Sequence, residues 1–143
     1  MKTNLRQVLT AAGFAMALTL IAAPLKAQQG KFTLPVEAHW GNAVLEPGDY
    51  RISGPAPTST IGVIYIYGGG KAQMALPAVS DTQKLSGHSY LRLINVGGTY
   101  VVREFNSGYT GHSYTFGIPK TLRLRMTPQA DHDVATLLDV SGN

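Results

Sequence analysis

The 143-residue sequence has no cysteine, and only 14% of its residues are charged. Without cysteine the chain has no disulfide, no thiol nucleophile, no Cys-ligated zinc and no iron–sulfur cluster. The low charge argues against a disordered polymer, and the 16 Gly and 8 Pro predict many turns. Beyond residue 27, Gly, Pro or a charged residue interrupts every apolar run, so no later segment predicts a membrane-spanning helix.

The longest apolar stretch lies at the N-terminus. Lys2 and Arg6 precede an uncharged, mostly apolar run that ends at Pro24, and a small residue follows at the expected cleavage position. A basic start and an apolar run too short to span a bilayer are typical of a secretory signal peptide. We therefore expect a signal-peptide helix over 1–27, a mature domain over 28–143, and a periplasmic or extracellular location. An uncleaved anchor is the alternative.

The positive charge of the chain belongs largely to that segment. Lys and Arg together number 12 against 8 Asp and Glu, which gives a net charge of +4. Lys2, Arg6 and Lys26 all lie in the predicted signal peptide, so the mature domain is close to neutral. A nearly neutral domain has little electrostatic reason to bind phosphate polymers, and we expect no nucleic-acid partner.

Hydrophobic alternation with a period of two dominates the mature sequence and predicts strands. Residues 32–40 alternate on one face, and Pro35 predicts that this strand lies at an edge or breaks there. Residues 60–67 are apolar on both faces, which predicts a central strand. Residues 121–126 alternate with a basic outer face, and 134–140 are read as a terminal strand rather than a short helix.

Turn signals separate these strands. Gly68–Gly70 and Gly97–Gly98 each predict a hairpin, because Gly adopts the positive φ angles of tight turns. The segment 46–49 predicts a turn, whereas 79–87 and 106–113 are expected to be polar, turn-rich loops. About eight short strands with regular turns predict an all-β domain, either one antiparallel β-sandwich or a small barrel.

The segment 106–114 is the best sequence candidate for a ligand-binding loop, because it is rich in Gly, Ser and Tyr. Tyr109, His112 and Tyr114 are its candidate ligand-binding residues, since aromatic rings offer a flat surface on which a sugar ring can stack. The competing interpretation is ordinary packing, because tyrosine is common in half-buried strands.

Metal and catalytic signals are weak. Asp131, His132 and Asp133 form the densest cluster of metal-ligand types, but adjacent residues have poor geometry for one metal ion, and a solvated turn is favoured. The sequence has no G-x-S-x-G nucleophile motif and no zinc-ligand spacing. A carboxylate pair such as Glu37 with Glu104 fits a glycosidase, yet nothing selects it over other pairs. We expect no enzyme activity, no metal and no cofactor.

Two short motifs near the mature N-terminus carry a resemblance. They are Phe32-Thr33-Leu34-Pro35-Val36-Glu37 and Leu45-Glu46-Pro47-Gly48-Asp49-Tyr50, with a later Leu-x-x-x-x-Gly-x-Tyr pattern over 93–100. The chain resembles a group of short exported β-rich proteins of acidobacterial type, whose second motif usually reads L-P-A-G-x-Y. Here Glu46 and Pro47 replace the usual Pro-Ala pair. The resemblance implies an exported β-sandwich-like domain in which a P-G-x-Y turn leads into a strand, and it assigns no catalytic residue.

These features predict an exported, non-enzymatic β-domain with a structural or self-assembling role in the envelope or outside the cell. Self-association would use unpaired strand edges, with 32–40 and 134–140 as the expected edges. The first alternative is a glycan- or ligand-binding module that uses the loop 106–114. The second alternative is a hydrolase with a carboxylate pair. After cleavage at 27 we expect no stable membrane span.

Overall fold

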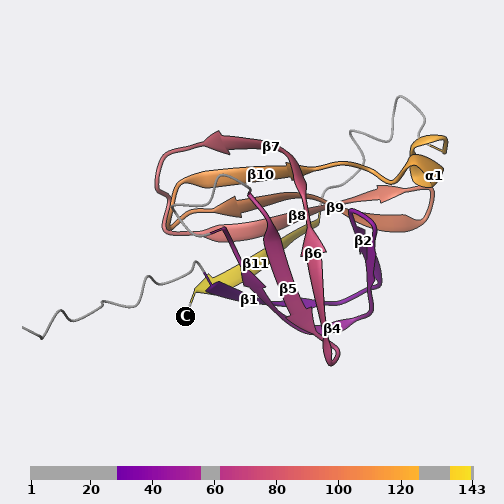
Figure 1. Cartoon of the computed structure of the whole chain (residues 1–143), viewed down its shortest axis with the longest axis horizontal. Coiled ribbons are helices and arrows are strands. Elements are labelled where there is room, and N and C mark those ends of the chain that lie inside the picture. Colours follow the sequence, from indigo (N-terminus) through magenta and orange to yellow (C-terminus); the bar gives the residue numbers. More distant parts are fainter. Residues whose placement is uncertain (1–28, 56–61, 126–135, 143) are drawn as a thin grey trace, which may run out of the picture.

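A computed structural model describes residues 29–55, 62–125 and 136–142 (Figure 1). The predicted signal peptide over 1–27 and the cluster Asp131–Asp133 lie outside the described residues. The described residues form eleven strands and one short helix, in this order: β1 (Gln29–Leu34), β2 (Ala38–Trp40), β3 (Ala43–Leu45), β4 (Gly48–Ser53), β5 (Ile64–Gly68), β6 (Lys71–Ala75), β7 (Pro77–Thr82), β8 (Ser89–Val96), β9 (Thr99–Ser107), β10 (His112–Phe116), α1 (Lys120–Arg123) and β11 (Thr136–Gly142).

The strands form one strongly curved sheet that nearly closes into a barrel. Along it the order is β3-β2-β9-β8-β11-β1-β4-β5-β6, and β10 and β7 extend it from the second half of β9. Strands β2 and β9 run parallel, and the other pairs are antiparallel. Figure 1 shows β5 and β6 crossing in front of the two longest strands, β8 and β9. The predicted all-β class, a sandwich or small barrel, is confirmed.

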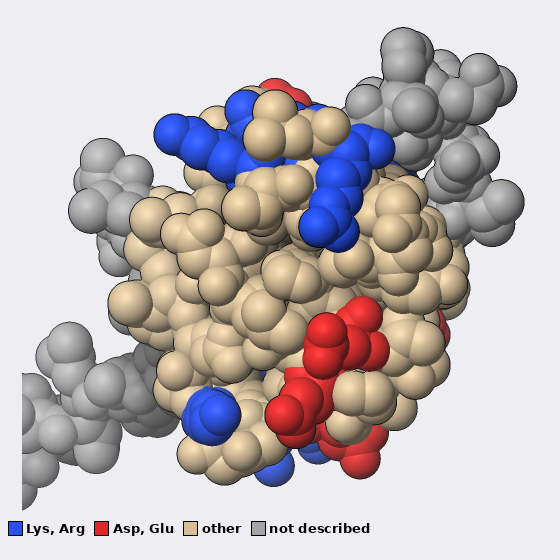
Figure 2. All heavy atoms as spheres, turned by 90° about the vertical axis from the view of Figure 1, so that its right-hand side faces the viewer, with Lys and Arg blue, Asp and Glu red and all other residues tan. Residues whose placement is uncertain are grey.

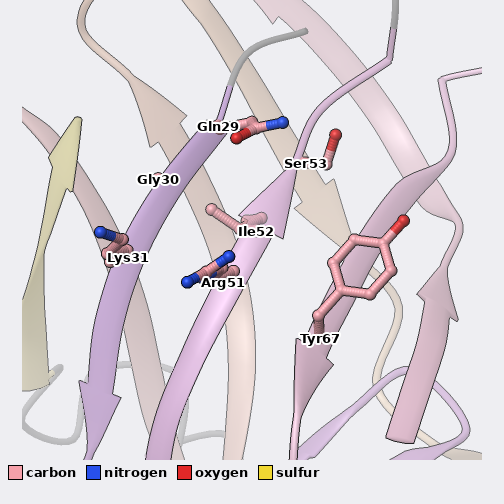
Figure 3. A pocket seen from close by; sticks show the side chains of 7 residues that line it. All are labelled: Gln29, Gly30, Lys31, Arg51, Ile52, Ser53 and Tyr67. Carbon is pink, nitrogen blue, oxygen red and sulfur yellow. The ribbon is translucent and has the colours of Figure 1, made fainter. Parts of the chain in front are cut away.

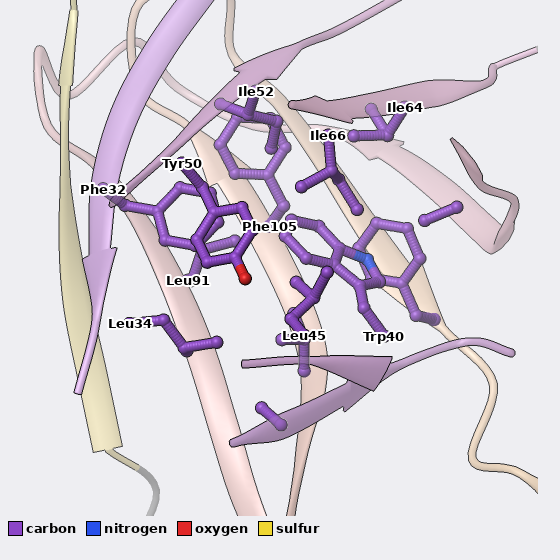
Figure 4. Close-up of a cluster of buried hydrophobic side chains, with 14 of the residues drawn as sticks. Phe32, Leu34, Trp40, Leu45, Tyr50, Ile52, Ile64, Ile66, Leu91 and Phe105 are labelled. Carbon is purple, nitrogen blue, oxygen red and sulfur yellow. The ribbon is translucent and has the colours of Figure 1, made fainter. Parts of the chain in front are cut away.

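The inward side chains of these two layers form the core (Figure 4). Trp40 is fully buried, and its ring centroid lies 6.0 Å from that of Phe32 and 5.2 Å from that of Phe116. Phe32 also stacks on Tyr50 at 5.5 Å. These rings come from β1, β2, β4 and β10, so the core connects strands from both halves of the sheet. Burying each such ring contributes about 1.5–3 kcal/mol through the hydrophobic effect.

The structure confirms both predicted hairpins. Gly69 and Gly70 have φ angles of 57° and 73° in the β5–β6 hairpin, and Gly97 and Gly98 have 57° and 86° in the β8–β9 hairpin. Both are two-residue turns with a positive φ at each position, and residues that carry a Cβ rarely adopt a positive φ. The chain also breaks at Pro35, between β1 and β2.

The expectation of a strand over 121–126 is wrong for its described part, because α1 occupies Lys120–Arg123. Pro119 precedes it with ψ 139°, and its carbonyl accepts hydrogen bonds from the backbone N–H groups of Leu122 and Arg123. Leu122 is buried beside Ile94, Val96, Val101 and Ile118, whereas Leu124 is 91% exposed. The helical turn therefore buries one leucine instead of one face of a strand. Among the described residues, no helix is long and apolar enough to cross a membrane.

Other segments also differ from expectation. Strand β7 occupies part of the predicted loop 79–87, because β10 pairs with it along 77–82. Half of the predicted loop 106–113 is strand, because β9 ends at Ser107 and β10 begins at His112, with a turn over 108–111 between them. Strand β5 is not central and is not buried on both faces: it lies one strand from the β6 end, and its alternate side chains are exposed. The described end of the chain, β11, is the strand expected over 134–140.

The expected edge over 32–40 is wrong for Ala38 and His39, because β2 pairs with β3 on one side and with β9 on the other. Within the described residues, 32–34 of β1 pair with β4 alone, and 136–140 of β11 pair with β8 alone, as expected of edges. Strands β1 and β11 meet just outside these ranges. Gly30 pairs with Gly142, and Lys31 pairs with Ser141. β1 pairs on its other side with β4, and β11 pairs with β8. Within the described residues β1 and β11 pair only at these two positions, and beyond them the two strands separate. Among the strands that the structure describes, β7 is an edge, because it pairs there with β10 alone and 78–82 are exposed.

Candidate ligand-binding face

The structure does not bring Tyr109, His112 and Tyr114 together as a stacking surface. Tyr114 is only 4% exposed, and its ring stacks on Phe105 at 6.0 Å, inside the core. His112 is exposed, with its ring 6.2 Å from that of Tyr114. Tyr109 is 60% exposed and lies close to Gly142 at the end of β11. Tyr109 is therefore an isolated exposed ring, and Tyr114 serves packing.

Two exposed aromatic rings lie side by side on β5 instead. Ile64 and Ile66 point inward and are 0% and 1% exposed, so Tyr65 and Tyr67 point outward and are 39% and 45% exposed. Successive side chains of a strand alternate between its faces, which places both tyrosines on the same side. Their ring centroids lie 6.5 Å apart with an interplanar angle of 21°. The two rings thus offer adjacent, nearly parallel surfaces to solvent.

Neighbouring strands extend this surface with polar and flexible side chains. The register places Ser53 and Met74 on either side of Tyr65, and Arg51 beside Tyr67. On the next strand, Lys31 lies opposite Arg51. We call this outer surface of β1, β4, β5 and β6 the tyrosine face.

Two adjoining hollows lie on the tyrosine face. The smaller has a volume of about 340 Å³ and is drawn in Figure 3; its lining is Gln29, Gly30, Lys31, Arg51, Ile52, Ser53 and Tyr67. The larger is about 830 Å³, shares Lys31, Arg51 and Tyr67 with the first, and adds Asp49 of β4 and Asp139 of β11. Side chains from four strands therefore surround one continuous depression.

The separation of β1 from β11 opens the larger hollow. Past Lys31 and Ser141 the two strands no longer pair, and both contribute side chains to its walls. Thr33 donates a hydrogen bond to Asp49 with an oxygen–oxygen distance of 2.6 Å, which orients that carboxylate. These contacts hold polar groups at defined positions around the depression, as a binding site requires.

Tyr50 fixes the floor of the larger hollow. Its hydroxyl donates a hydrogen bond to the Glu46 carbonyl at 2.7 Å, within the turn that the P-G-x-Y motif predicts. Burial, together with the negative charge of Glu46, raises the pKa of Tyr50 above 10.0. Tyr50 lies opposite Gly68, where an added Cβ would overlap its ring. The absence of a side chain at Gly68 therefore leaves room for the tyrosine ring.

The carboxylates suggested by the sequence do not form a pair. Glu104 accepts a hydrogen bond from the Ser113 hydroxyl at 3.0 Å and lies 3.4 Å from Arg92 Nε, while Glu37 is exposed in the β1–β2 connection. The carboxylates that line one hollow are Asp49 and Asp139, which no motif had indicated. In the part of the chain that the structure describes, no group of three or more His, Cys, Asp or Glu residues could hold a metal ion.

A second charged surface lies at the α1 end. Figure 2 shows Lys and Arg gathered at the top of this side of the molecule and Asp and Glu lower down. Lys120, Arg123 and Arg125 are exposed there beside Leu124. None of these three basic residues lines either hollow.

Comparison with known proteins assigns no function: no protein-family model, no curated protein and no solved structure matches the chain. The site therefore rests on its own geometry. The sequence pattern favoured Tyr109 and Tyr114 over Tyr65 and Tyr67, because the loop 106–114 was expected to be exposed and 60–67 to lie in the centre of the sheet. The signal that could have found them is the alternation Ile-Tyr-Ile-Tyr over 64–67, in which the purely aliphatic and the hydroxyl-bearing side chains fall on opposite faces.

Proposed function

We propose that the protein is an exported, non-catalytic domain that binds carbohydrate on the tyrosine face. The observation that carries the proposal is the pair of exposed, nearly parallel rings of Tyr65 and Tyr67, 6.5 Å apart. Tyrosine combines an apolar ring face with a polar hydroxyl, which suits a sugar that presents C–H groups on one side and hydroxyls at its rim. Export is supported by the signal-peptide pattern over 1–27.

The polar residues around the rings support the same ligand class. Gln29 and Ser53 can both donate and accept hydrogen bonds, Arg51 donates, and Asp49 accepts. A sugar hydroxyl both donates and accepts, so a mixed set of this kind can satisfy several hydroxyls at once. The hollow of about 340 Å³ is at the small end of ligand sites, and the adjoining hollow leaves room for a longer saccharide.

Binding to a panel of soluble polysaccharides, measured by the retardation of the mature domain in affinity gels, tests this proposal. Tyr65→Ala and Tyr67→Ala should each weaken binding about tenfold, because a stacking contact contributes about 1 kcal/mol or more. Tyr109→Ala is the matched control, since its ring is also exposed but lines neither of the two hollows and lies beside Gly142 at the end of β11. If Tyr109→Ala loses binding and the two β5 variants do not, the binding site lies in the loop 106–114 and not on the tyrosine face.

A second candidate function is self-association, which the open edge of β7 favours. This strand pairs with β10 alone, and Val79 is 52% exposed within it. An unpaired edge offers backbone N–H and C=O groups to another strand. Val79→Lys adds a charge to this exposed edge, so it should lower the sedimentation coefficient of any oligomer. A protein that sediments as a monomer at high concentration contradicts this candidate function.

A hydrolase is the remaining alternative, and Asp49 with Asp139 is the carboxylate pair to test. The non-catalytic proposal predicts that the bound polysaccharide keeps its length during prolonged incubation. If the protein releases reducing ends, and this release stops in Asp49→Asn and in Asp139→Asn, the protein is a hydrolase and the non-catalytic proposal is wrong.

A further inference from the structure

Two basic side chains lie directly opposite each other on the tyrosine face. Lys31 of β1 and Arg51 of β4 are register partners, and both are exposed. The ion pairs found among the described residues join His88 with Asp139 and Arg92 with Glu104, so neither Lys31 nor Arg51 has a carboxylate within 4.0 Å there. Like charges directly opposite each other on paired strands are destabilising.

Positive and negative side chains are distributed unevenly along the depression. The hollow of about 340 Å³ is lined by Lys31, Arg51 and uncharged residues, with no carboxylate among them. The carboxylates of Asp49 and Asp139 line only the larger hollow. Asp49 is the register partner of Thr33, two residues along β1 from Lys31, and the Thr33 hydroxyl donates to it. The smaller hollow is therefore the positively charged end of the site.

Tyr67 lies within that positive end. It is the register partner of Arg51, and it lines both hollows. In Figure 3, Lys31, Arg51 and Tyr67 come from three neighbouring strands around the smaller hollow. One ring and two cations thus border a space of about the size that a single sugar unit needs.

We propose that the saccharide is anionic, and that a uronic-acid unit binds with its carboxylate between Lys31 and Arg51 and its ring against Tyr67. This inference rests on the proposed carbohydrate-binding function. The planar guanidinium of Arg51 matches a carboxylate with two parallel hydrogen bonds, and the ammonium of Lys31 adds a point charge. Sulfate esters carry the same negative charge in a tetrahedral group, so the experiment includes them.

Calorimetric titration of the full mature domain with three polymers tests the inference. Polygalacturonate carries free carboxylates, its fully methyl-esterified form has the same backbone without charge, and dextran sulfate carries sulfate. We expect polygalacturonate to bind at least tenfold more tightly than its ester at low salt, with a preference that shrinks as salt increases. Lys31→Gln and Arg51→Gln should each remove most of this preference, and Arg51→Lys should restore only part of it.

Lys120→Gln is the matched control, because it removes one exposed positive charge at α1, away from the hollows. An equal loss of preference in Lys120→Gln would overturn the inference in favour of general charge attraction. Tighter binding of dextran sulfate than of polygalacturonate would overturn the carboxylate assignment.

Two further outcomes separate the inference from the proposed function. Equal binding of polygalacturonate and its ester that still depends on Tyr65 and Tyr67 would overturn the anionic ligand and leave carbohydrate binding intact. Binding of polygalacturonate that depends on Lys31 and Arg51 but is unchanged by Tyr67→Ala would overturn the stacking that the proposed function requires.

Discussion

Replacing Gly68 with Ala tests how the floor of the larger hollow is built. Gly68 has no positive φ, so its backbone conformation suits alanine. An added Cβ would nevertheless overlap Cδ1 of the Tyr50 ring and lie 2.6 Å from Cε1 and 2.8 Å from the Asp49 carbonyl oxygen. The ring cannot move freely, because it stacks on Phe32 at 5.5 Å and its hydroxyl donates to the Glu46 carbonyl.

The cost follows from these contacts. Forcing an extra methyl group into a packed position costs about 1–3 kcal/mol. Displacing the Tyr50 ring would also break its hydrogen bond to Glu46, which costs about 1 kcal/mol more. We expect Gly68→Ala to destabilise the domain by about 2–4 kcal/mol, in the range of a core truncation. A domain of this size loses roughly 4 °C of Tm for each kcal/mol.

Urea unfolding of the mature domain measures the effect, with Gly117→Ala as the matched control. Gly117 also lacks a positive φ, but an added Cβ there meets nothing within 4 Å. This control should be neutral or stabilise the domain by up to about 1 kcal/mol, because alanine restricts the unfolded chain. Equal stability of Gly68→Ala and Gly117→Ala would refute the argument.

A double-mutant cycle isolates the contact between the methyl group and the ring. Tyr50→Ala removes the ring and its hydrogen bond, so Gly68→Ala on that background should cost less than about 1 kcal/mol. If the full cost persists without the ring, the strain comes from the Asp49 carbonyl instead.

Three tyrosines and the helix α1 should each affect the free energy of unfolding. Burial raises the pKa of Tyr50, Tyr90 and Tyr114 above 10.0, with the charge of Glu46 adding at Tyr50 and that of Glu104 at Tyr90. The folded state therefore holds these three protons more tightly than the unfolded state. The free energy of unfolding should not depend on these tyrosines below about pH 10, and it should fall as pH rises through their raised pKa values. A free energy of unfolding that increases in that pH range would contradict the raised pKa values. Leu122→Ala should destabilise the domain by about 2–4 kcal/mol in urea unfolding, because Leu122 is 6% exposed. Leu124→Ala should change stability by less than about 0.5 kcal/mol, because Leu124 is 91% exposed; comparable losses would mean that α1 does not pack through Leu122.

Features that depend on neighbouring residues were predictable. The hairpins at Gly69–Gly70 and Gly97–Gly98 follow from the positive φ that two successive turn residues need. The turn before Tyr50 and the break at Pro35 follow from the fixed φ and missing N–H of proline. In each case the sequence itself restricts the backbone, whatever the rest of the chain does.

Features that depend on distant partners were not predictable. Strand β7 has little hydrophobic alternation and exists because β10 pairs with it. Strands β1 and β11 pair with each other at Lys31 and Ser141, just outside the edges expected over 32–40 and 134–140. These two residues are about a hundred positions apart in sequence, and no local pattern encodes that register. The candidate site depends on the same information, because its residues come from β1, β4, β5 and β11.

An all-β domain without thiol chemistry follows from local features: the absence of cysteine, the period-two alternation and the Gly-Gly turns. Which side of each strand faces solvent depends on the folded domain. The folded domain buries Tyr114 against Phe105, although that residue had been the candidate for stacking. It exposes Tyr65 and Tyr67, because only one face of β5 lies against the core. A strand can turn either face inward, and the layer packed against it makes the choice.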